Sequence, residues 1–157
     1  MPSSLNRSGP RQRAGRVFSN SLRGQRYVPT PMIEITIPVA AANFSGANSG
    51  IWAWIAPFAV EFLGAEAIWA TAGTNTVRVK KVKSAATSAP GAAADANNVD
   101  ISTTFDLTQA ANVRREATPV ITGGANILAQ GDKVALASAA GTTGLAGGVV
   151  VLYFGAI

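Results

Sequence analysis

From residue 32 onward, short apolar or alternating runs are separated by clusters of Gly, Asn, Ser and Pro. This spacing is typical of strands joined by turns, because every second side chain of a strand lies on the same face. Residues 32–39 alternate isoleucines with Glu34 and Thr36, and the strand is expected to end at Pro38 or soon after. The other runs expected to form strands are 51–63, 66–72, 76–84, 99–107, 120–123, 125–129, 133–139 and 147–157. We therefore predict an all-β fold, a β-sandwich or jelly-roll-like domain over residues 32–157.

Two of these runs carry more detailed expectations. Residues 51–63 are apolar on both faces and predict one strand buried between layers, with an edge or bulge at Pro57. Residues 66–72 and 76–84 flank Gly-Thr-Asn and predict a hairpin. Residues 85–98 are small and polar and predict a long surface loop.

The segment before the strands has a different composition. Residues 1–30 contain six arginines and no acidic residue, a charge of +6, whereas residues 31–157 contain seven basic and eight acidic residues, a charge of −1. The segment has too few apolar residues to fold alone. We predict that residues 1–31 form an extended basic N-terminal arm with a reach of about 100 Å at ~3.3 Å per residue. It lacks the apolar run of a secretory signal, and its glycines and proline argue against an amphipathic transit helix.

The residue types exclude most catalytic chemistry. The chain has no cysteine and no histidine, so thiolate nucleophiles, His-based acid–base pairs and the usual zinc ligand sets are absent from the sequence. Glu61 and Glu66 form the closest carboxylate pair in an apolar setting, but they are expected on opposite faces unless a turn at Gly64 intervenes. The glycine pairs lack the Lys-Ser/Thr of a phosphate-binding loop. We therefore expect no enzyme activity, no catalytic residue, no metal and no cofactor.

Aromatic and basic side chains suggest binding surfaces instead. Trp52 and Trp54 are expected on one face of their strand, with Phe58 further along; core packing and an oligomer interface both remain open for them. The basic cluster Arg78, Lys80, Lys81 and Lys83 alternates with valines and is expected on the solvated outer face of the hairpin. It has no interleaved aromatic residues, so it gives little support to nucleic-acid binding. The longest apolar stretches, 51–60 and 145–157, are too short to span a bilayer.

Residues 127–154 read ILAQGDKVALASAAGTTGLAGGVVVLYF. This segment is similar to the ending of small structural proteins of tailed bacteriophages, in which a Gly-Asp turn introduces a V-A-L-A strand. Together with the basic arm and the Ala-, Gly- and Thr-rich β domain, the chain resembles capsid decoration (cement) proteins. The resemblance implies a virion protein, made in the host cytoplasm, that binds the major capsid protein on the outside of the head as a homotrimer. It brings no catalytic residue.

The aromatic residues of 51–63 and the basic arm are the two predicted sites. The oligomer interface is predicted at Trp52, Trp54 and Phe58. The capsid-binding residues of the arm are Arg7, Arg11, Arg13, Arg16, Phe18, Leu22, Arg23, Arg26 and Tyr27. Three alternatives remain open: a capsid protein whose arginine-rich arm contacts the packaged genome, a phage tail or fibre protein, and a sugar-binding β-sandwich.

Overall fold

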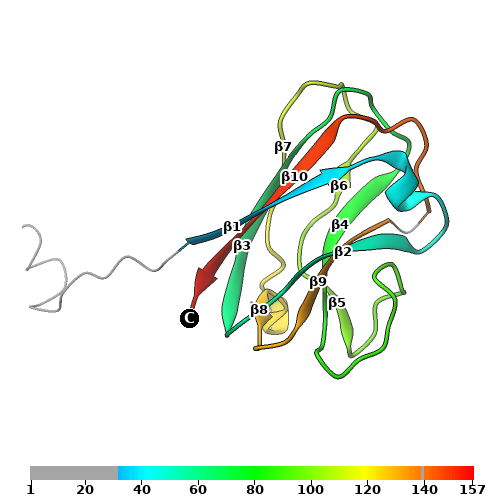
Figure 1. Ribbon diagram of the computed structural model, residues 1–157. Coiled ribbons are helices and arrows are strands. Elements are labelled where there is room, and N and C mark those ends of the chain that lie inside the picture. Colours follow the sequence, from blue (N-terminus) through cyan, green and yellow to red (C-terminus); the bar gives the residue numbers. More distant parts are fainter. Residues whose placement is uncertain (1–31, 139) are drawn as a thin grey trace, which may run out of the picture. The chain divides into compact units, whose positions relative to one another are not determined.

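The computed structural model describes residues 32–138 and 140–157, so the predicted arm lies outside the described residues. The described residues form two antiparallel sheets that pack as a β-sandwich (Figure 1), which confirms the predicted fold class. Sheet 1 contains β1 (Met32–Val39), β10 (Gly148–Ala156), β3 (Val60–Ile68), β7 (Arg115–Ala117) and β8 (Ile127–Leu128). Sheet 2 contains β2 (Ser49–Ile55), β9 (Lys133–Ser138), β4 (Thr76–Val82), β5 (Asn98–Asp100) and β6 (Phe105–Asp106). Two short 3₁₀ turns, η1 (Ala41–Phe44) and η2 (Thr122–Gly124), lie between strands.

The strand order is that of a jelly roll. The pairs are nested: β1 pairs with β10, β2 with β9, β3 with β7 and β8, and β4 with β5 and β6. Successive pairs belong alternately to sheet 1 and sheet 2. Two further pairings, β10 with β3 and β9 with β4, join the nested pairs into sheets. A long antiparallel hairpin rolled up in this way gives the two-sheet jelly roll.

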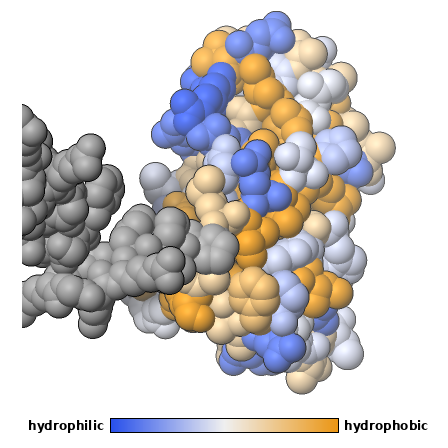
Figure 2. Space-filling model, turned by 60° about the vertical axis from the view of Figure 1, so that its left-hand side comes forward, coloured by the Kyte–Doolittle hydropathy of each residue, from blue (hydrophilic) through white to orange (hydrophobic). Residues whose placement is uncertain are grey.

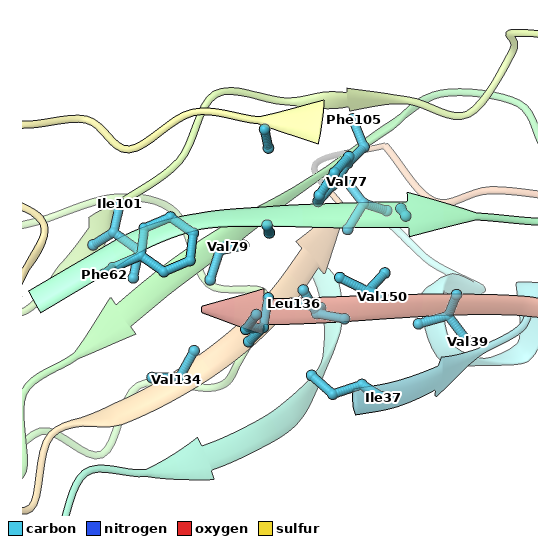
Figure 3. Close-up of a cluster of buried hydrophobic side chains, with 14 of the residues drawn as sticks. Ile37, Val39, Phe62, Val77, Val79, Ile101, Phe105, Val134, Leu136 and Val150 are labelled. Atoms are coloured by element: carbon cyan, nitrogen blue, oxygen red, sulfur yellow. The ribbon is translucent and has the colours of Figure 1, made fainter. Parts of the chain in front are cut away.

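The core lies between the two sheets and consists of the inward-facing residues of both (Figure 3). Phe154 of β10 is at its aromatic centre, with its ring centroid 4.8 Å from that of Trp54 and 5.5 Å from that of Phe62. Trp54 comes from sheet 2 and Phe62 from sheet 1, so Phe154 connects the layers. Tilted aromatic pairs at these separations add to the free energy gained by burying the rings.

Two of the detailed strand predictions are wrong. Residues 51–63 do not form one strand: β2 ends at Ile55 in sheet 2, and β3 begins at Val60 in sheet 1. Pro57 lies in the connection between them, where its missing N–H costs no ladder hydrogen bond. The predicted hairpin of residues 66–72 and 76–84 is also absent, because β3 and β4 belong to different sheets. The residues between them cross from one layer to the other.

Loop 84–97 covers the outer face of sheet 2, in agreement with the predicted loop at 85–98. It packs so closely on the start of β2 that a Cβ on Gly91 would overlap the carbonyl oxygen of Asn48. The ammonium group of Lys80 lies beneath the loop, with 1% of the residue exposed, and donates to the carbonyl oxygen of Ala92. Asn98 donates to the same carbonyl at 3.0 Å. These bonds hold the loop on the sheet.

Candidate interaction surface

The outer face of sheet 1 exposes large apolar side chains between its charged residues. Its central strand, β10, alternates the buried residues of the core with Val149, Val151 and Tyr153, which are half-buried on the outside. β3 adds Leu63 and Ile68, which are 46% and 40% exposed. Figure 2 shows hydrophobic residues exposed between hydrophilic ones on one face of the molecule. Side chains that a monomer exposes in this way are typical of a contact surface.

A β-bulge in β3 determines which residues face outward. Tyr153 pairs with Gly64 and Phe154 pairs with Phe62, so Leu63 is an extra residue without a partner in β10. Gly64 has a φ of +144°, a backbone conformation that residues other than glycine rarely adopt. The extra residue shifts the alternation by one position, and Glu61 and Glu66 therefore lie on the same outer face.

All four glutamates of the chain lie on this face. Glu34 is opposite Tyr153, Glu61 is opposite Gly155, and Glu66 is opposite both Val151 and Glu116. The four aspartates are elsewhere and accept hydrogen bonds in turns or pair with cations: Asp95 from Asn97, Asp100 from Arg78, Asp106 from Thr108 and Asp132 from Ser84. The chain therefore has an acidic, apolar surface that belongs to sheet 1 alone.

Arg114 neutralises part of this charge. Its guanidinium group donates to Glu66 and lies 2.9 Å from a carboxylate oxygen of Glu116. The hydrogen bond from Arg114 lowers the pKa of Glu66, although partial burial of Glu66 acts in the opposite direction. Burial raises the pKa of Tyr153, and the negative charges of Glu66 and Glu34 raise it further. In the strand register, Glu34 of β1 lies opposite Tyr153, and Glu66 of β3 lies opposite Val151, two residues before Tyr153 on the same face of β10.

Two hollows flank this ion-pair cluster. The first, of about 150 Å³, is lined by Glu66, Ala67, Ile68, Arg114, Val149 and Val151. The second, of about 220 Å³, is more polar and is lined by residues of β3, β7 and β10 that include Leu63, Glu116, Thr118 and Tyr153. Each hollow combines an apolar wall with a carboxylate. Such a surface suits a ligand that carries both cationic and apolar side chains.

The Glu66–Arg114 pair predicts a pH dependence of stability. Because the folded-state pKa of Glu66 lies below its ordinary value of 4.5, the pair stabilises the fold above that pH and loses this effect as the pH falls through the lowered pKa. Glu66→Gln should therefore flatten the dependence of melting temperature on pH between about pH 6 and about pH 3. Glu34→Gln, which keeps the pair, is the control. Equal slopes for Glu66→Gln and the wild type would contradict this prediction.

The predicted oligomer-interface residues are divided by a second bulge. Trp52 pairs with Ala135 and Trp54 with Val134, which leaves Ala53 as the extra residue of β2. Trp52 therefore faces outward, 47% exposed, with the Lys133 ammonium 5.5 Å from its ring centroid, whereas Trp54 packs on Phe154. The expectation that the two tryptophans share a face was wrong. Phe58 is 45% exposed. An interface at these three residues stays a prediction, and the core contact of Trp54 fits the packing alternative.

The basic cluster of β4 is not a solvated patch. Arg78 pairs with Asp100 at 2.8 Å, Lys80 is buried beneath loop 84–97, and Lys81 donates to the carbonyl oxygen of Ile127 in sheet 1 at 2.7 Å. Burial lowers the pKa of both lysines, with partial compensation from nearby aspartates. Lys83 alone of the four is exposed. Sequence reasoning missed this because it treated β4 as half of a solvated hairpin.

The remaining site predictions lie outside the described residues. All nine predicted capsid-binding residues belong to the arm.

Among residues 32–138 and 140–157, no group of three acidic, histidine or cysteine side chains is arranged to hold a metal ion. The same residues contain no helix with the length and hydropathy of a membrane span. No family model, curated protein or solved structure matches the chain.

Proposed function

We propose that this chain is a structural virion protein, a decoration (cement) protein that binds the major capsid protein lattice from outside and stabilises the head. The observation that carries the proposal is the division of charge. The arm has a charge of +6, whereas five of the seven cations of residues 31–157 have partners within the domain. We therefore expect the arm to bind the capsid protein and so to attach the jelly-roll domain to the head.

The fold and the resemblance of residues 127–154 to phage structural proteins support the same proposal. Jelly rolls recur in virus capsid domains and in lectins. A fold alone does not assign a function, so the proposal depends on the arm and on the acidic, apolar face as well. A domain with few charged residues and exposed apolar side chains on one sheet suits a lattice in which much of its surface contacts other protein.

The proposed mechanism is stabilisation by mass action. A ligand that binds the assembled lattice and not its separated subunits shifts the equilibrium toward the lattice. Arginines of the arm are suited to pair with capsid carboxylates through two parallel hydrogen bonds each. Each copy then bridges capsid subunits that the pressure of packaged DNA pushes apart.

A genome-binding arm is the second candidate, because six arginines without an acidic residue also suit DNA phosphates. The two candidates differ in their dependence on salt. Neutralising about six phosphates should cost ~10³-fold in affinity between about 50 and about 200 mM salt, because binding releases counterions. Bidentate pairs in apolar grooves are screened much less.

We expect attachment of the full chain to purified virus heads, measured by co-sedimentation, to change little over this salt range. The protein should show little binding to a duplex DNA probe at physiological salt, measured by fluorescence anisotropy. Tight and steeply salt-dependent DNA binding that is lost in a variant with Arg7, Arg11, Arg13 and Arg16 changed to Ala would instead favour the genome-binding candidate.

A further inference from the structure

We propose that the acidic, apolar outer face of sheet 1 is the docking site for residues 17–28 of the arm of a second copy of this chain. The contact would link copies into the oligomer. The inference goes beyond the proposed function, because it concerns the contact between copies and does not require a capsid.

The two halves of the arm differ in composition, and one of them matches the face. Residues 1–16 contain four arginines and few large apolar residues, whereas residues 17–28, VFSNSLRGQRYV, combine two arginines with Val17, Phe18, Leu22, Tyr27 and Val28. The face combines four glutamates with an apolar stripe along β10 and β3, and among residues 32–138 and 140–157 Arg114 alone forms ion pairs with these glutamates. Residues 17–28 are therefore complementary to it in charge and in hydrophobicity.

Individual residues on the face also place a carboxylate next to an apolar side chain. Glu34 has no pairing cation among the described residues and lies opposite Tyr153, which lines the second hollow. Glu116 is 63% exposed and has a contact with Arg114 only. Leu63 lines the second hollow, and Ile68 lines the first. An extended segment that crosses the face would meet a carboxylate and an apolar wall at each hollow.

Length and local sequence favour the arm of a second copy. Twelve residues extend about 40 Å, and the eight or nine residues of β1, β3 and β10 extend about 30 Å, so the segment is long enough to cross the face. Only Pro29, Thr30 and Pro31 separate the segment from β1. Three residues, two of them prolines, leave little chain for a reversal onto the chain's own sheet. In this inference Phe18, Leu22, Arg23, Arg26 and Tyr27 contact a second copy and not the capsid, so capsid binding is left to Arg7, Arg11, Arg13 and Arg16.

Disulfide trapping in the full chain tests the contact directly, because the chain has no native cysteine. Leu22→Cys protein is mixed with separately purified Ile68→Cys or Leu63→Cys protein under mild oxidation. We expect a cross-linked dimer in which mass spectrometry identifies position 22 joined to position 68 or 63. The matched control is Thr76→Cys, an exposed position on sheet 2, and we expect it to cross-link less than a tenth as much.

Paired arginine variants of the full chain provide the second test. Arg23→Ser with Arg26→Ser should raise the dissociation constant of the oligomer about tenfold, measured by sedimentation equilibrium. Arg7→Ser with Arg11→Ser, which removes the same charge from the other half of the arm, should leave it unchanged. Three results would overturn the inference: a monomeric wild type, equal cross-linking at position 76, or no cross-link between position 22 and position 68 or 63. Neither experiment includes a capsid. Failure of the inference in these tests would therefore leave the proposed capsid binding untouched.

Discussion

Removal of residues 1–30 is expected to leave the β-sandwich folded and to abolish attachment of the protein to virus heads. The ten strands and the core that the structure describes lie after residue 31, so the truncated chain keeps the contacts described for the jelly roll. It loses all six arginines of the arm and therefore the charge on which attachment depends. Circular dichroism measures the fold, and co-sedimentation with heads measures attachment.

A variant with the six arginines of the arm changed to lysine is the control for charge alone. Lysine keeps the charge but cannot form the bidentate pairs of arginine, so this variant should attach more weakly than the wild type and more strongly than the truncated chain. Unfolding of the truncated chain would contradict the separation of arm and domain. Attachment at wild-type strength by the truncated chain would contradict the role of the arm.

Replacement of Phe154 by alanine is expected to lower the free energy of unfolding by about 3–5 kcal/mol. The Phe154 side chain is fully buried and contacts both Trp54 of sheet 2 and Phe62 of sheet 1. Its removal leaves a cavity at the point where the layers meet, and β-sheets relax only partly around such a cavity. Urea denaturation followed by tryptophan fluorescence gives the change.

The adjacent residue is the control for this prediction. Tyr153 lies on the outer face of the same strand, so Tyr153→Ala should cost about 1 kcal/mol or less, as is usual for substitutions outside the core. Similar losses for Phe154→Ala and Tyr153→Ala would contradict the assignment of inner and outer faces in β10.

The sequence predicted strands best where alternation is regular. The expected strand at 32–39 has the same bounds as β1, and those expected at 133–139 and 147–157 differ from β9 and β10 by one residue at the ends. These strands have inward residues at every second position, and a local pattern of period two is enough to find them. The long loop before β5 was predicted from its small and polar residues for the same local reason.

The errors arose where the pattern depends on distant partners. Residues 51–63 are almost continuously apolar, so nothing local indicates that the chain changes sheets after Ile55; Pro57 was interpreted as a bulge within one strand. The bulges at Ala53 and Leu63 are fixed by pairing with β9 and β10, which follow far along the chain. Each bulge moves the side chains beyond it to the opposite face.

The acidic face of sheet 1 was missed for this reason. Regular alternation would place Glu61 and Glu66 on opposite faces, and only the turn considered at Gly64 could have brought them together. Glu116 lies between the expected strands at 99–107 and 120–123, although it pairs opposite Glu66 in β7. The one signal in the sequence was the absence of any lysine or arginine from residues 32–72, a stretch that contains three of the four glutamates.

The most direct test of the proposed function is the position of the protein in a virus particle. Particles recovered from an induced culture of the organism that carries the gene are labelled with gold-conjugated antibodies against the chain and imaged by electron microscopy. We expect gold at regular positions over the outside of intact heads, without prior disruption of the particle. Gold on tails or fibres alone, or labelling only after heads are opened, would contradict the proposal that the protein decorates the capsid surface.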